Sequence, residues 1–169
     1  MKKKIIIFIL LNLISFNSKA EIVYIDINFI LNSSEVGKYL NNYIEKINNQ
    51  ASLKYKKIEN ELIQKEKTLI SQQNILDKNE FERKLKTLTT EVQKYRSNRK
   101  TSVDELNNIK IKKTKEILSA LNPIITEYVE TNSISIVIPK KNIVVGRKNL
   151  DITNQIIKLL NNSITKLEF

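Results

Sequence analysis

The 169-residue sequence contains no cysteine, no histidine and no tryptophan, and it has only two glycines and two prolines. Without cysteine the chain can form no disulfide and cannot carry a lipid on a cysteine thioether. The missing histidine and cysteine remove the commonest general base and two common metal ligands. Two glycines are too few for a phosphate-binding loop. These absences predict a protein that is not an enzyme and that has no cofactor or metal.

The carboxylates give no competing indication of catalysis. Asp26 follows an apolar stretch and is a possible catalytic acid, but a capping or turn role beside Asn28 is the favoured interpretation. Acid pairs such as Asp104 and Glu105 lie in charge-mixed helical sequence, where no enclosing pocket is expected. The sequence therefore contains no catalytic constellation.

The first twenty residues have the pattern of a secretory signal. A basic start at Met1 to Lys4 precedes an apolar run from Ile5 to Ile14, and Ser18-Lys19-Ala20 supplies small residues for cleavage. The alternative is an N-terminal membrane anchor, but the run is shorter than the roughly 20 residues that span a bilayer. We therefore expect residues 1–20 to be a signal peptide that is cleaved after Ala20.

Positive charge is concentrated in the middle of the chain. Residues 36–122 contain 19 Lys and Arg against 11 Asp and Glu, a net charge of +8. The rest of the expected mature chain has six basic and seven acidic residues, a net charge of −1. This excess is either a solvated helical face or a surface that attracts acidic polypeptides, anionic lipid or nucleic acid.

Residues 36–122 also have a helical period. They contain no proline, and apolar residues recur at spacings of three, four and seven, as in a coiled-coil seam. The first set is Leu40, Ile44, Ile47, Ala51, Tyr55, Ile58, Leu62, Leu69 and Leu76, and the second is Phe81, Leu85, Leu88, Val92, Tyr95, Leu106, Ile109 and Ile117. Arg99 and Ser102 interrupt the second set, so we expect the arms to be loosely packed and flexible there.

A polar tetrapeptide, Asp77-Lys78-Asn79-Glu80, separates the two sets. Folding the chain back at this point pairs Leu69 with Leu88 and Leu62 with Tyr95, which predicts an antiparallel hairpin of two arms. Each arm has about 40 residues and is about 60 Å long. One uninterrupted helix of about 85 residues is the alternative.

The flanking segments, residues 21–35 and 123–169, predict a small discontinuous β-rich body on which the hairpin stands. We expect strands at 22–27, 134–138 and 143–145, a helix capped by Ser33 or Ser34, and a final helix capped by Asp151. Together the flanks have 62 residues, a marginal size for an independent core. The fold class is therefore α+β, predominantly α, with a body that buries its strands by oligomerisation. The expected oligomerisation residues are Ile22, Tyr24, Ile134, Ile136, Ile138, Ile143 and Val145.

Both flanks resemble a known family. The stretch Ile22-Val-Tyr-Ile-Asp-Ile-Asn28, continued by Asn32-Ser-Ser-Glu-Val-Gly-Lys38, is similar to the opening of the Skp/OmpH family of periplasmic chaperones. The C-terminal flank resembles the end of the same family, with Leu150-Asp151-Ile152-Thr153 before a closing apolar helix. The pair Val145-Gly146 departs from the family, whose members often have an aromatic followed by a small residue. The resemblance covers the whole expected mature chain in order and length.

The resemblance implies a periplasmic homotrimer whose arms enclose a cavity and hold unfolded outer-membrane β-barrel proteins without ATP. Near the predicted tip, basic residues flank an apolar pair, and we expect this cluster to contact clients: Leu76, Lys78, Phe81, Arg83, Lys84 and Lys86. An anionic lipid surface is a possible further partner. The alternatives are a structural coiled-coil protein and a basic nucleic-acid- or lipid-binding protein of the cell envelope. An export signal argues against nucleic acid as the partner.

Overall fold

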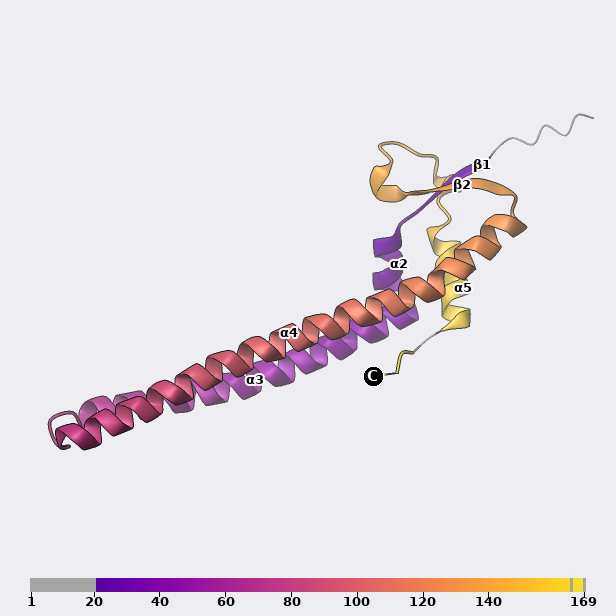
Figure 1. The fold of residues 1–169 in the computed structure, drawn as a ribbon. Helices are drawn as coiled ribbons and strands as arrows, with labels where there is room; N and C mark the ends of the chain where they lie inside the picture. Colours follow the sequence, from indigo (N-terminus) through magenta and orange to yellow (C-terminus); the bar gives the residue numbers. More distant parts are fainter. Residues whose placement is uncertain (1–20, 165, 169) are drawn as a thin grey trace, which may run out of the picture.

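The computed structural model describes residues 21–164 and 166–168, so the predicted signal peptide at 1–20 lies outside the described residues. A long helical hairpin projects from one side of a small body that holds the strands and the short helices (Figure 1). The element order is β1 Glu21–Ile25, α2 Ile27–Ser33, α3 Glu35–Ser71, α4 Lys78–Thr131, β2 Ile134–Pro139 and α5 Thr153–Ser163. The predicted class, mainly helical with a small strand-containing body, is confirmed.

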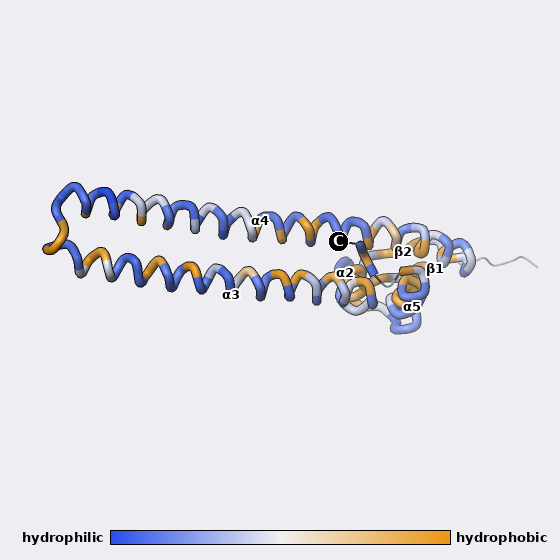
Figure 2. The backbone as a smooth tube through the Cα atoms, turned by 90° about the horizontal axis from the view of Figure 1, so that it is seen from below, coloured by the Kyte–Doolittle hydropathy of each residue, from blue (hydrophilic) through white to orange (hydrophobic). Residues whose placement is uncertain are grey.

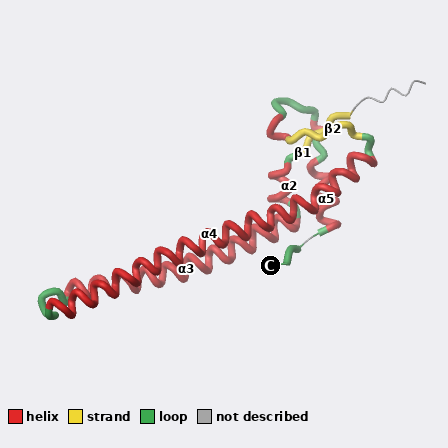
Figure 3. Tube along the Cα trace, viewed as in Figure 1, coloured by secondary structure: helices red, strands yellow, loops and turns green. Residues whose placement is uncertain are grey.

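The two strands lie side by side in the body and run parallel (Figure 3). Tyr24 of β1 pairs with Ile138 of β2, and on its other edge Tyr24 forms an isolated bridge with Asp151. The bridge is closed by the Ile152 amide, which donates to the Tyr24 carbonyl at 3.0 Å. Strand β1 is therefore paired on both edges, and β2 on one.

The core lies where the sheet, α2, α5 and the roots of the arm helices meet. Its fully buried apolar side chains come from α2, α3, α4 and α5: Ile30, Val36, Ile117, Leu121, Ile156 and Leu160. The strands add Val23, Ile25 and Ile134. Helix α4 passes through Pro123 without a break, so the arm continues into the body as one helix.

Local sequence explains where the helices begin. Asp26 accepts a hydrogen bond from the Phe29 amide at 2.9 Å and so caps α2. Ser34 accepts one from the Gly37 amide at 3.2 Å and caps α3, which confirms the predicted serine cap. Gly37 is required by close packing, because an added Cβ would lie 1.9 Å from the Leu31 carbonyl oxygen.

The hairpin is confirmed, but its turn was predicted at the wrong residues. The chain reverses between Ser71 and Lys78, and Lys78 to Glu80 form the first turn of α4 rather than the connection. The reason is Asp77, whose carboxylate accepts from the Glu80 amide at 3.0 Å and caps the second helix. Leu76 consequently lies in the turn instead of on a helix seam.

The strand predictions need two corrections. The first strand ends at Ile25 rather than Ile27, because Asp26 starts the short helix α2, which the sequence analysis did not predict. The third strand, at 143–145, is absent from the sheet of the described residues, which has two strands. Ile143 is extended, with φ −110° and ψ 124°, but among residues 21–164 and 166–168 no strand pairs with this segment. Extended backbone without a ladder partner does not form a sheet.

Candidate binding surfaces

The arm carries large apolar side chains that face solvent. They occur on both helices and in the turn: Leu53, Ile63, Ile70, Ile75, Leu85, Val103 and Ile111. Apolar and polar segments alternate along the whole hairpin (Figure 2). Among the described residues between Leu40 and Ile117, Leu69 alone is a buried hydrophobic side chain. The arm therefore presents apolar groups over most of its length.

Polar and aromatic contacts join the two arm helices along the edges of their seam. Lys65 forms an ion pair with Glu91 at 2.6 Å, and the Tyr55 hydroxyl donates to the Asn98 carbonyl at 2.9 Å. Tyr55 also packs edge-on against Tyr95, with ring centroids 6.0 Å apart. Such exposed pairs hold the two helices in register but contribute little free energy.

The two members of each predicted seam pair line the same groove between the helices. Leu69 and Leu88 line one open groove of about 640 Å³ near the tip. Leu62 and Tyr95 line another groove, closer to the middle of the arm. Both predicted pairs therefore lie along shared grooves, whereas the ring of Tyr95 packs against Tyr55, which is seven residues before Leu62.

The seam is interrupted where the sequence analysis expected. Arg99 and Ser102 line a cavity of about 330 Å³ between the helices, together with Tyr55 and Tyr95. The Arg99 guanidinium donates to the Tyr95 hydroxyl at 3.4 Å, a long contact at an exposed site. This part of the arm has space in place of interdigitated apolar side chains.

The six residues of the predicted tip cluster lie in different surroundings in the structure. Arg83 and Lys84 line the groove near the tip, and Lys84 also forms an ion pair with Glu80 at 3.3 Å. Leu76 and Phe81 are half-buried, whereas Lys78 and Lys86 are exposed. A client-contacting role for these six residues stays a prediction.

The sequence analysis missed the most exposed apolar residues of the tip, Ile70 and Ile75. They are 61% and 80% exposed. Their positions carried a usable signal, because both are large apolar residues that fall outside the seam spacing and so cannot pack in the hairpin.

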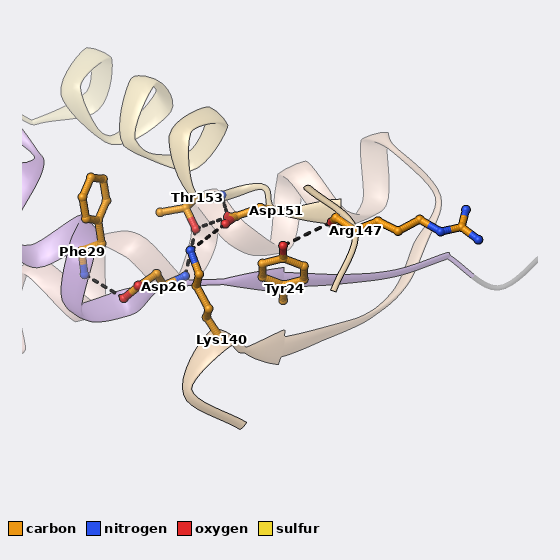
Figure 4. A network of polar contacts seen from close by, with 7 residues as sticks. All are labelled: Tyr24, Asp26, Phe29, Lys140, Arg147, Asp151 and Thr153. Atoms are coloured by element: carbon orange, nitrogen blue, oxygen red, sulfur yellow. Dashed lines mark hydrogen bonds and ion pairs between the residues drawn. The ribbon is translucent and has the colours of Figure 1, made fainter. Parts of the chain in front are cut away.

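The body surface around β1 is organised by a polar network (Figure 4). Lys140 forms an ion pair with Asp151 at 3.0 Å, and Asp151 accepts from the Thr153 amide at 3.0 Å and from the Thr153 hydroxyl. The Asp26 amide donates to the Thr153 hydroxyl oxygen at 2.9 Å. The prediction that Asp151 caps the last helix is wrong, because Ile152 is the N-cap residue of α5 and Asp151, one residue earlier, is held in the bridge to Tyr24. The Asp151 carboxylate still accepts a hydrogen bond from the Thr153 amide.

This network sets the charge state of its ion pair. Burial raises the pKa of Asp151, but hydrogen bonds from Thr153 and Lys140 outweigh it and lower that pKa below its ordinary value. The hydrogen bond to Asp151 and the attraction of its charge raise the pKa of Lys140. Both groups are thus held in their charged forms at neutral pH.

The network and Tyr24 hold the chain between Pro139 and Asp151 in place. The Tyr24 hydroxyl donates to the Arg147 carbonyl at 3.2 Å, and an added Cβ at Gly146 would lie 2.7 Å from the Tyr24 ring. Between these fixed points, Val144 and Val145 are 99% and 89% exposed. Two apolar side chains are therefore presented to solvent on an anchored loop.

The predicted oligomerisation residues separate into buried and exposed groups. Tyr24 and Ile134 are buried within the single chain, and Ile138 and Ile143 are half-buried. Ile22, Ile136 and Val145 are exposed and are free to contact another chain. Val144 belongs with this group and was not among the predicted residues.

In the described part of the chain, no helix is both long and apolar enough to cross a membrane. The same residues contain no group of three or more acidic side chains placed to hold a metal ion.

Comparison with known proteins agrees with this architecture. The family model described as outer membrane protein (OmpH-like) matches residues 21–160. A crystal structure from Caulobacter crescentus CB15, described as a candidate outer membrane chaperone (OmpH-like), superposes with a TM-score of 0.82 at 17% sequence identity, and the match covers 89% of each chain. No curated protein matches the chain. The family match spans the strands, the whole arm and most of α5, and on this evidence the chain belongs to the OmpH-like outer membrane protein family.

Proposed function

We propose that this protein is an ATP-independent periplasmic holdase, which binds unfolded outer-membrane β-barrel proteins between its helical arms and prevents their aggregation. The family match and the fold shared with a candidate chaperone support this assignment. The pattern of residues 1–20 supports export to the periplasm. Residues 21–169 are then the working protein.

The observation that carries the proposal is the set of exposed apolar side chains, spread over both helices and the turn of a strongly basic arm. The seven residues from Leu53 to Ile111 named above lie within the segment whose net charge is +8. An unfolded barrel protein exposes alternating apolar residues and unpaired backbone groups, which favour aggregation. Many separate apolar contacts can hold such a chain without imposing one conformation, and basic charge attracts acidic clients over longer distances.

We further propose that the body assembles into a homotrimer. Ile22 and Ile136 are exposed on the paired strands, and Val144 and Val145 are exposed on the loop after β2. A body of this size gains stability by burying them. The number three rests on the resemblance to the Skp/OmpH family. Sedimentation equilibrium on residues 21–169 tests it, and a stable monomer would contradict the assembly.

The test of holding is an aggregation assay. A urea-denatured outer-membrane β-barrel protein is diluted into buffer with residues 21–169 at near-stoichiometric ratios and without nucleotide, and light scattering is followed. We expect scattering to be suppressed. A structural coiled-coil protein would assemble but leave the scattering unchanged, which would contradict the proposal.

A matched pair of variants tests which surface of the arm binds the unfolded client. Replacing Leu53, Ile63, Val103 and Ile111 together by serine removes exposed apolar groups, and we expect most of the suppression to be lost while the fold is kept. The control replaces Asn60, Gln64, Gln93 and Asn107 by serine on the same helices, at exposed polar positions. Equal loss in both variants would show that these exposed apolar residues are not the binding surface.

The remaining alternative, nucleic-acid binding by the basic arms, predicts a different behaviour. Affinity for DNA would fall steeply as salt rises, because neutralised phosphates release counterions. We expect no such salt-dependent binding at physiological ionic strength. Contact with an anionic lipid surface stays a prediction and is separated from client holding by flotation with vesicles that contain anionic phospholipid.

A further inference from the structure

We propose that one groove of the arm binds a single extended segment of an unfolded barrel protein, about nine residues long and with alternating apolar side chains. This inference rests on the proposed holding function and names the part of the client that the arm takes. The groove, called the long groove below, lies between α3 and α4 and has a volume of about 910 Å³. Four residues of α3, between positions 59 and 66, line it together with a longer stretch of α4, from Leu85 to Asp104.

The length of the long groove fits one strand of a membrane barrel. From Leu85 to Val103 the axis of α4 advances about 27 Å at the standard helical rise. An extended chain covers that distance in about eight or nine residues. A strand that crosses an outer membrane has about 9–11 residues, and the apolar band of a barrel is about 25 Å tall. The groove near the tip is shorter, because its lining on α4 runs only from Arg83 to Glu91, about 12 Å.

Three exposed apolar side chains along the long groove have the spacing of one face of a strand. Leu85 and Val103, at its two ends, are 46% and 52% exposed, and Ile63 on α3 is 40% exposed. Lys65, two residues after Ile63, forms an ion pair with Glu91 of α4. Ile63 therefore lies opposite the middle of the stretch between the other two, roughly 12–15 Å along the arm from each. Four residues of an extended chain span about 13 Å, and side chains four residues apart lie on the same face, so one segment can contact all three.

The long groove also offers partners for the backbone of such a segment. A single extended segment leaves its N–H and C=O groups unpaired, and those groups need donors and acceptors. The Arg96 guanidinium is a donor, and the Glu59 and Glu66 carboxylates are acceptors. In the part of the chain that the structure describes, none of these three side chains has a hydrogen-bond or ion-pair partner. The other charged residues of the lining are Arg99, Lys100 and Asp104. Basic and acidic groups balance in this lining, so recognition here depends on apolar spacing and backbone contacts rather than on the net charge of the client.

The test compares two synthetic ten-residue peptides of the same composition, each with the same terminal lysines for solubility. In one peptide leucine alternates with serine, and in the other the leucines are consecutive. Anisotropy of a fluorescent label on the peptide, titrated with residues 21–169, gives the two affinities. We expect the alternating peptide to bind about fivefold more tightly or better. Equal affinities, or no binding of the alternating peptide, would overturn the proposal.

A matched pair of variants then assigns the binding to the long groove. The groove variant replaces its three exposed apolar residues by serine: Ile63, Leu85 and Val103. The control makes the same change at three more exposed apolar residues of the same two helices that lie outside the groove: Leu53, Ile70 and Ile111. We expect the groove variant to bind the alternating peptide about tenfold more weakly, and the control to stay within about twofold of the unmutated chain.

Equal weakening in both variants contradicts the proposal. A change of assembly state confined to the groove variant, measured by sedimentation equilibrium, contradicts it as well, because the groove would then hold a second copy of the chain. If the groove variant loses helix content by circular dichroism, Val103→Ser replaces it with Ile111→Ser as its control, and we expect a smaller, about threefold, difference.

The peptide measurement is independent of the aggregation assay, so the two proposals can fail separately. Suppressed client aggregation together with equal peptide affinities in the two variants would refute the long groove and leave the holding function intact. Unsuppressed aggregation together with the tenfold difference would refute holding and leave the groove as a binding site for extended apolar segments.

Discussion

The body and the arm bury their apolar side chains to very different extents. In the body, residues from two strands and four helices close a core in which Ile30, Ile117, Ile156 and Leu160 are fully buried. In the arm, two helices touch along a narrow and interrupted seam, and large apolar residues such as Ile75 remain exposed. Stability therefore resides in the body, and the arm keeps the open apolar surface that weak, multiple binding requires.

The largest expected effect comes from comparing the cost in unfolding free energy of truncating two isoleucines on the same helix, α4. Ile117→Ala empties a fully buried site in the body core and is expected to cost about 2–5 kcal/mol. Ile111→Ala, six residues toward the tip at a 67% exposed site, is expected to cost no more than about 0.5 kcal/mol. Urea unfolding at matched protein concentration measures both, and equal costs would break the distinction between body and arm.

A second test concerns the junction of the two regions. Gly37→Ala adds a Cβ that would lie 1.9 Å from the Leu31 carbonyl oxygen, so α2 and α3 must separate. We expect a loss of roughly 1–3 kcal/mol despite the better helix propensity of alanine. Thermal unfolding measures the loss. A variant as stable as the unmutated chain would mean that the close packing of α2 on α3 is unnecessary.

A third test fills the cavity that Arg99 and Ser102 line between the two arm helices. Arg99→Leu with Ser102→Leu puts apolar side chains into the cavity between the helices and is expected to stabilise the arm by about 1 kcal/mol. Hydrogen exchange at the middle of α3 and α4 should slow, while exchange in the body stays the same. Faster exchange in the arm would show that this cavity is not where the seam is weak.

The smallest expected effect comes from the ion pair on the body surface. The lowered pKa of Asp151 means that its contribution is present above the unfolded-state pKa near 3.8 and is lost as pH falls through the folded-state value. The raised pKa of Lys140 means that its contribution is lost only as pH rises through a value above 10.5. Between these limits Lys140 and Asp151 are both charged and their ion pair is kept.

Asp151→Asn is expected to lower the unfolding midpoint slightly at pH 7 and to leave no difference from the unmutated chain well below pH 3.8. Thermal unfolding across that range is the measurement. A difference between the two chains that persists unchanged in strong acid would assign the effect to something other than the charge of Asp151.

Features that depend on local spacing could be predicted from the sequence. The seam from Leu40 to Ile117 predicted the hairpin because helical periodicity is visible over many turns. Ser34 and Asp26 are capping residues whose side chains reach amides three residues later, and that reach is short-range. The turn was misplaced because the polar run Asp77 to Glu80 was interpreted as a loop, although Asp77 three residues before Glu80 is also a helix start.

Features that depend on distant partners could not be predicted. Ile143 to Val145 have high β propensity, but a strand needs a neighbour, and the part of the chain that the structure describes supplies none. The parallel pairing of β1 with β2 follows from how the arm helices return to the body, which no local pattern records. Exposure of Ile70 and Ile75 at the tip likewise depends on where the chain turns.

The central claim is that the body supplies stability and the arm supplies the binding surface. Hydrogen exchange of residues 21–169, measured with and without a denatured outer-membrane β-barrel protein, tests it most directly. The account predicts that arm amides exchange faster than body amides in the free protein, and that the client slows exchange around the exposed apolar residues of α3 and α4. Slowing confined to the body, or no slowing at all, would contradict it.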